Sequence, residues 1–143
     1  MYLVDTNIWL EYQLNQARAQ DARQFLAAFD GSRYSISDFS LHSVGVILGR
    51  RQQFSVLDQF VTDLFIQGQV SHRAVPARQM LAVTAAMPAQ RLDFDDAYQY
   101  VIAKRDLLTL VSFDTDFDHT DLPRQTPAQI LAALPPPPAP TTS

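Results

Sequence analysis

The chain has 143 residues, of which 47% are hydrophobic and 18% are charged. This length supports one compact core rather than two, and the hydrophobic content excludes wholesale disorder. Because the sequence contains no cysteine, it excludes a disulfide scaffold, a cysteine-bound zinc site and thiol catalysis. No apolar run approaches the length of a membrane span and no basic leader opens the chain, so we expect a soluble cytoplasmic protein with no membrane partner.

The acidic residues are biased in kind. Of 15 acidic residues only Glu11 is a glutamate, and the stretch from Asp93 to Asp121 holds eight aspartates. Solvated helices ordinarily favour glutamate, because the shorter aspartate side chain competes with the helix backbone for hydrogen bonds. The bias therefore indicates caps and turns, or carboxylates gathered at a metal ion. The net charge of -4 argues against nonspecific coating of nucleic acid, but it does not exclude a nucleic-acid enzyme whose metal offsets the acids.

Apolar runs and turn-forming residues predict strands that alternate with helices in the first half of the chain. The expected elements are, in order, a buried strand over 2–4 ending at Asp5, a helix capped by Thr6 or Asn7, a helix over 18–29, a strand over 33–36, a helix from Ser37 to about Gly49 and a helix over 56–67 ended by Gly68. Ser37 is a good N-cap, and Gly31 suits the left-handed position that closes a helix.

The second half continues this alternation. The expected elements are a strand within 70–75, a helix that Pro76 starts and Pro88 terminates, a helix from about 94 to 103, a strand over 107–113 and a final helix over 126–134. The continuous apolar run over 107–113 is typical of a strand buried in a parallel sheet. We therefore predict an α/β fold, a three-layer sandwich in which helices surround a mostly parallel central sheet.

We expect this single domain to cover residues 1–134. The remaining stretch, 135–143, holds five of the nine prolines and is predicted to be a polyproline-like extension separate from the domain.

Four aspartates are candidates for the chemistry of the chain. Asp5 and Asp114 each follow a predicted strand, Asp116 comes two residues later, and Asp96 lies in the first turn of the helix before the last strand. In an open parallel sheet the ligand site lies beyond the carboxyl ends of the strands, so these acids converge if the two strands are neighbours. Gathered carboxylates repel one another unless a cation neutralises them, and hard oxygen ligands favour Mg²⁺ or Mn²⁺. Such ions serve phosphodiester hydrolysis well.

Two segments carry a resemblance to a known family. VDTNIWL, at residues 4–10, resembles the opening motif of PIN domains, and DDAYQYVIAKRDLLTLVSFDTDF, at 95–117, resembles their closing block. Their order and spacing, and the length of the chain, resemble VapC-type toxins of bacterial toxin–antitoxin pairs over roughly residues 1–120. The resemblance implies a PIN-like fold and an endoribonuclease that hydrolyses RNA phosphodiester bonds with Mg²⁺ or Mn²⁺. It also implies an antitoxin protein as partner and a homodimer.

The resemblance also assigns roles to residues of this chain. The implied metal ligands are Asp5, Asp96 and Asp114, Asp116 is the fourth implied catalytic acid, and Asn7 and Ser112 are implied polar supports. Structural readings remain beside these: Asp5 could cap the following helix, Asp96 could be an acid favoured by the helix dipole, and Asp116 could form a turn.

One part of the chain departs from the family pattern. PIN domains usually carry a glutamate on the helix after the second strand, and the corresponding place here is Ser43, while Glu11 belongs to another helix. Asp38 and His42, one helical turn apart, are possible substitutes, although neither lies on the face of Ser43. The departure motivates an alternative from another class: a catalytically weakened PIN fold that acts as an RNA- or protein-binding module.

Overall fold

The computed structural model describes residues 1–136. The four strands are β1 (Tyr2–Val4), β2 (Tyr34–Ser37), β3 (Ser71–Arg73) and β4 (Thr109–Val111). The helices are α1 (Thr6–Leu14), α2 (Ala19–Ala27), α3 (Asp38–Arg50), α4 (Phe54–Val61), α5 (Met80–Gln90), α6 (Phe94–Arg105) and α7 (Pro127–Ala132). Short helical turns are η1 (Gly31–Arg33), η2 (Thr62–Gln67), η3 (Ala77–Gln79) and η4 (Thr115–Phe117). Residues 137–143, most of the predicted proline-rich extension, lie outside the described residues.

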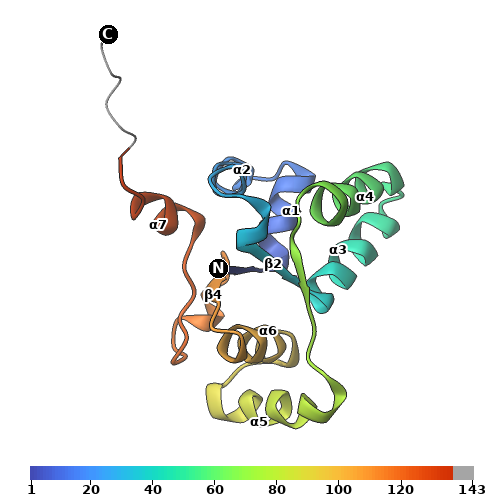
Figure 1. The fold of residues 1–143 in the computed structure, drawn as a ribbon. Coiled ribbons are helices and arrows are strands. Elements are labelled where there is room, and N and C mark those ends of the chain that lie inside the picture. The colour runs from blue at the N-terminus through green and yellow to red at the C-terminus, as the bar shows by residue number, and fades with distance from the viewer. Residues whose placement is uncertain (137–143) are drawn as a thin grey trace.

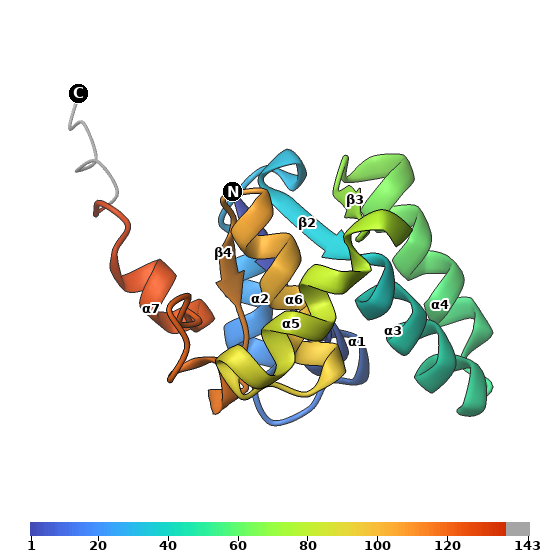
Figure 2. The same ribbon diagram turned by 90° about the horizontal axis from the view of Figure 1, so that it is seen from below.

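The strands form one parallel sheet in the order β3-β2-β1-β4, which confirms the predicted α/β class. Helices α5 and α6 cover one face, and α1 to α4 lie on the other (Figures 1 and 2). The period of two along each strand divides the core accordingly. Leu3 and Leu110, paired in register, pack with residues of α5 and α6, while the paired Val4 and Val111 pack with the helices of the opposite face.

The order of the strands places a switch point between β1 and β4. From β1 the chain moves to β2 and then β3 on one side, and it crosses back to put β4 on the other side of β1. At such a point the connections leave in opposite directions and open a crevice at the carboxyl ends of the strands. Asp5 and Asp114 follow these two neighbouring strands.

After β4 the chain turns back and then runs parallel to that strand along its outer edge. Gln125 forms a parallel bridge with Val111, in which the Gln125 amide donates to Leu110 and the Ser112 amide donates to Gln125. Thr126 then caps α7 through a capping box with Gln129, which positions the last helix against α2.

Two predictions about the ends of helices are wrong in detail. The N-cap of α1 is Asp5 itself, whose carboxylate accepts from the Thr6 amide, rather than Thr6 or Asn7. Pro88 does not terminate α5, which continues to Gln90 and closes at Arg91 in the left-handed conformation.

Gly31 does not adopt the left-handed conformation that the sequence suggested. It starts the turn η1 instead, and an ideal Cβ on it would lie 1.6 Å from the carbonyl oxygen of Gly68. Glycine is required there because two backbone segments approach closely, not because of a positive φ.

Candidate metal centre at the carboxyl end of the sheet

Three of the four predicted acids lie within reach of one ion. Carboxylate oxygens of Asp96, Asp114 and Asp116 all lie within 4.8 Å of one another. Asp96 comes from the first turn of α6, and the other two come from the segment after β4. Asp96 and Asp114 are half-buried and Asp116 is exposed, so the cluster is open to solvent on one side.

Local hydrogen bonds fix the backbone of these acids. Asp93 caps α6 by accepting from the Asp96 amide at 3.0 Å. Asp114 in turn accepts from the Asp116 amide at 2.9 Å and begins the turn η4. Caps at the starts of helical segments thus place both pieces of the cluster, and they leave carboxylate oxygens available to a ligand.

Asp5 lies deeper than the cluster and is not a member of it. The side chain is 8% exposed and accepts four hydrogen bonds. Oδ1 accepts from the Thr6 amide at 2.7 Å and from Gln99 Nε2 at 3.0 Å, while Oδ2 accepts from Ser112 Oγ at 2.7 Å and Asn7 Nδ2 at 3.2 Å. A carboxylate offers about four lone-pair positions, so the protein itself satisfies Asp5. Asn7 and Ser112 occupy the supporting places that the sequence indicated.

Electrostatic repulsion is strong at this end of the sheet. Burial, and after it the negative charges of Asp93, Asp5, Asp114 and Asp116, together raise the pKa of Asp96 to about 7. Burial also raises the pKa of Asp5, against the opposing effect of its hydrogen bonds from Ser112, Thr6 and Gln99. Carboxylates in this condition favour either protons or a bound cation.

The basic side chains that form ion pairs within the described residues pair with acids outside the cluster. Within 1–136 the ion pairs join Arg73 and Arg105 to Asp106, Lys104 to Asp121, and Arg124 to Asp118. None of these pairs includes a member of the cluster. One exposed cation lies near it: the guanidinium of Arg18 lies 4.7 Å from the centre of the Phe113 ring, and its Nη1 lies 3.5 Å from the Phe113 carbonyl oxygen.

The place of the missing glutamate is polar but uncharged. Ser43 is half-buried, and His42 is exposed; His42 and Asp38 line a pocket with aromatic and apolar residues, away from the three clustered acids. Glu11 accepts from the Arg18 amide at 2.7 Å, so it serves the junction between α1 and α2.

Sequence reasoning missed two residues at this site, Gln99 and Ser40. Gln99 Nε2 donates to both Asp5 and Ser40 Oγ, and Ser40 also contacts the hydroxyl groups of Thr6 and Ser37. A signal was present: Gln99 follows Asp96 by three residues, which puts an amide on the same face of an otherwise apolar stretch of helix.

The donor set fits a hard divalent cation. All three clustered side chains offer carboxylate oxygens, and the cluster has no protein cation to neutralise it within the described residues. Mg²⁺ and Mn²⁺ prefer such ligands and usually keep several waters, which the exposed side of the cluster can admit. The three aspartates can therefore hold a divalent ion.

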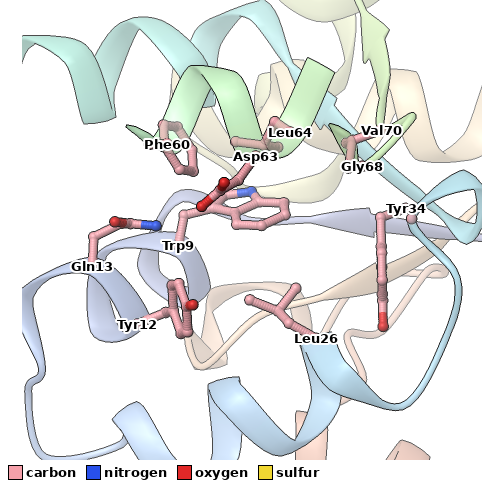
Figure 3. A pocket seen from close by; sticks show the side chains of 11 residues that line it. Trp9, Tyr12, Gln13, Leu26, Tyr34, Phe60, Asp63, Leu64, Gly68 and Val70 are labelled. Atoms are coloured by element: carbon pink, nitrogen blue, oxygen red, sulfur yellow. The ribbon is translucent and has the colours of Figure 1, made fainter. Parts of the chain in front are cut away.

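A second hollow lies between α1, β2 and η2. This pocket of about 250 Å³ is lined mainly by apolar side chains, among them Trp9, Leu26, Phe60 and Leu64, with Tyr12 at α1 (Figure 3). Trp9 is the only tryptophan of the chain and is 5% exposed. Helix α1 links the pocket to the acidic end of the sheet, because Asp5 caps this helix and Trp9 lies one turn later.

Parallel strands with a switch point that gathers acids define an α/β protein with a candidate metal centre. The sequence matches the family model of the PIN domain over residues 2–122, so the chain belongs to the PIN domain family. The resemblance stated from the two motifs is thereby confirmed. No curated protein matches the sequence at a significant level.

Solved structures agree with this family in fold. VapC20 of Mycobacterium tuberculosis, described as a sarcin–ricin loop cleaving toxin, is 19% identical with a TM-score of 0.69, covering 82% of this chain and 93% of its own. A toxin–antitoxin complex from Klebsiella pneumoniae is 21% identical with a TM-score of 0.66, covering 82% of this chain and 90% of that one. FitAcB from Neisseria gonorrhoeae is 17% identical with a TM-score of 0.67, covering 90% of this chain and 99% of that one. Across residues 1–136 no helix is long and apolar enough to cross a bilayer.

Proposed function

We propose that this protein is a Mg²⁺- or Mn²⁺-dependent endoribonuclease of the VapC toxin type. The observation that carries the proposal is the cluster of Asp96, Asp114 and Asp116, drawn from two distant segments and left without a protein cation among residues 1–136. Membership of the PIN domain family supports a nuclease, and the toxin–antitoxin relatives in fold support the toxin type.

In this proposal Asp96 and Asp114 hold the principal ion. Asp5, whose oxygens already accept four hydrogen bonds, adds its negative charge from beneath them. A divalent ion supplies positive charge that polarises a phosphoryl oxygen and acidifies water. Asp116, the exposed member, orients the attacking water and accepts its proton. The bond from phosphorus to the 3′ oxygen breaks and that oxygen takes up a proton, so the products are a 3′-hydroxyl and a 5′-phosphate.

RNA reaches the site from its open side. Arg18 is the cation best placed to contact a phosphate beside the one that is cleaved, because its guanidinium is held over Phe113, the residue before Asp114. Phosphate contacts of this kind position the strand without reading its sequence.

The deciding experiment combines Mn²⁺ titration by calorimetry with cleavage of a mixed RNA pool. Wild type and Asp114→Asn are compared, with Asp121→Asn as the matched control, because Asp121 is an acid of the same region that pairs with Lys104 outside the cluster. We expect wild type and Asp121→Asn to bind Mn²⁺ and cleave RNA, and Asp114→Asn to lose both. Mn²⁺ binding without cleavage would favour the alternative of a binding module, and a wild type that binds no Mn²⁺ at millimolar concentration would end the metal proposal.

We also propose an antitoxin protein as partner, with an apolar side chain of that partner seated in the pocket around Trp9. The pocket is apolar and open, and Tyr12, one of its lining residues, exposes 38% of its surface. The protein encoded beside this gene is expected to co-purify with the chain when the two are expressed together.

Because Trp9 is the only tryptophan of this chain, binding of a tryptophan-free partner should shift its fluorescence, and Tyr12→Ala should weaken the complex. An unchanged spectrum in a formed complex would place the partner elsewhere. The homodimer remains a proposal from the family resemblance, and sedimentation equilibrium tests it.

A further inference from the structure

Gln99 is a buried amide in a helix that otherwise fills the core with apolar groups. Its side chain is 2% exposed, between the buried residues Tyr98 and Tyr100 and one turn before Ile102 and Ala103. Burying an amide costs free energy unless hydrogen bonds compensate, and an apolar residue would avoid that cost. The contacts made by Gln99 must therefore explain why an amide stands there.

Those contacts join three parts of the site. Gln99 Nε2 donates to Asp5 Oδ1 at 3.0 Å and to Ser40 Oγ at 2.6 Å. Asp5 follows β1, Ser40 lies in the first turn of α3, and Gln99 lies on α6 one turn after Asp96. Of the four donors to Asp5, Gln99 is the one that belongs to α6, so it sets the position of Asp5 relative to Asp96.

The orientation of the amide follows from its neighbours. With Nε2 toward Asp5 and Ser40, both bonds are made, and Oε1 is left buried without a partner among the described residues. The reverse orientation would put Oε1 against a carboxylate oxygen, which repels it. An unpartnered buried carbonyl is unfavourable for folding, so this arrangement holds Asp5 at the expense of stability.

A neutral donor suits this position for an electrostatic reason. A lysine or arginine would bring a positive charge that competes with a metal ion, and a second carboxylate would repel Asp5. The amide donates a hydrogen bond to Asp5 and adds no charge of its own. The negative charge at the carboxyl end of the sheet therefore remains available to attract a cation.

We propose that Gln99 is a positioning residue of the cation site. Supported by Ser40, it holds the carboxylate of Asp5 in place beneath Asp96, so that Asp5 strengthens the hold of the cluster on a divalent ion. This inference rests on the proposed function, because it presumes that the cluster binds a cation.

Gln99→Met tests the inference, because methionine has a similar length and lacks the donor. Second-sphere partners of metal ligands typically change affinity or activity by about 10–100-fold, and we expect Mn²⁺ affinity measured by calorimetry to fall within that range. We expect kcat for RNA cleavage to fall with it while KM for RNA is unchanged. The melting temperature without metal should change little, because the loss of the hydrogen bonds to Asp5 and Ser40 is offset by removal of the unpartnered Oε1.

Tyr100→Phe is the matched control on the same helix, since it loses a hydrogen bond to Asp121 and does not contact Asp5 or Ser40. Its Mn²⁺ affinity should equal that of wild type. Ser40→Ala provides a second variant, in which Gln99 keeps Asp5 but loses its other partner. A smaller loss of Mn²⁺ affinity in the same direction is expected there.

The outcomes separate the two proposals. If wild type binds Mn²⁺ and both Gln99→Met and Ser40→Ala bind it equally well, Gln99 is only a core residue and this inference is wrong, while the metal proposal stands. If wild type binds no Mn²⁺, the metal proposal itself fails and this inference falls with it. In the metal-free protein, the side-chain NH₂ signals of Gln99 should shift in Asp5→Asn and not in Asp121→Asn; unshifted signals in Asp5→Asn would also overturn the inference.

Discussion

The four acids at the carboxyl end of the sheet form a floor and a rim, which differ in burial and in hydrogen bonding. Asp5, the floor, is 8% exposed and receives four donors from three segments of the chain. The rim consists of Asp96, Asp114 and Asp116, which are half-buried or exposed and whose mutual repulsion no ion pair of residues 1–136 relieves. The difference indicates that the folded protein itself satisfies the carboxylate of Asp5, whereas a bound cation would neutralise the charges of the rim.

The largest expected difference between floor and rim is in the stability of the metal-free protein. Asp5→Asn should lower the free energy of unfolding by about 2 kcal/mol, because an amide has one acceptor oxygen and its NH₂ group would face two of the four donors. Asp114→Asn should change it by less than about 0.5 kcal/mol, since an amide oxygen can still accept from the Asp116 amide. Urea unfolding in the presence of a chelator measures both, and equal losses would remove the distinction.

The dependence of stability on pH should report the rim. The pKa of Asp96 is raised to about 7 in the folded protein, above its ordinary value of 3.8. Between these values the folded protein holds a proton that the unfolded chain has released, so stability falls as pH rises from about 4 to 7 and then levels off. The melting temperature measured with a chelator should follow this course, and Asp96→Asn should lessen the fall and leave the part due to Asp5, whose pKa burial also raises.

Added Mn²⁺ should oppose that fall. The ion competes with the proton on Asp96, so the increase in melting temperature that Mn²⁺ causes should grow with pH up to about 7. An increase that is the same at pH 5 and pH 7.5 would mean that the ion binds away from Asp96.

A smaller effect is expected from the cation beside the rim. Arg18→Gln should raise KM for RNA by about three- to tenfold and leave kcat unchanged. The slope of RNA affinity against salt concentration should fall by the amount expected for the loss of about one phosphate contact. Arg23→Gln is the control, because Arg23 lies on the same helix and its guanidinium contacts Asn15 instead. If the two variants have the same KM and salt dependence, Arg18 has no role in RNA binding.

Much of this arrangement was predictable from residues close together in the sequence. Strand-end acids, an Asp93 cap and a buried apolar run before Asp114 are local patterns, and the rule for parallel sheets brings the strand ends together. That β1 and β4 are neighbours was a condition of this prediction, and the strand order meets it. The parallel sheet is confirmed and the three rim acids lie together as predicted, while their role in metal binding stays a proposal.

The remaining features depend on contacts that no local pattern encodes. Gln99 and Asp5 are separated by 94 positions, and their hydrogen bond exists only because α6 packs across the end of β1. Likewise the role of Gly31 depends on the approach of Gly68 from the far end of η2. Capping the helix and serving the site were treated as alternative roles for Asp5, but its buried carboxylate serves as the cap of α1 and as the floor together.

The bridge between Gln125 and Val111 has a consequence for how copies of this protein meet. The outer edge of β4 would otherwise present unpaired backbone groups, on which another molecule could add a strand and begin aggregation. Here the Leu110 carbonyl and the Ser112 amide already pair with Gln125, and the Ser112 carbonyl accepts from Arg124. Edge-to-edge growth of the sheet is thereby blocked at β4, which leaves β3 as the edge strand where another chain could pair with the sheet.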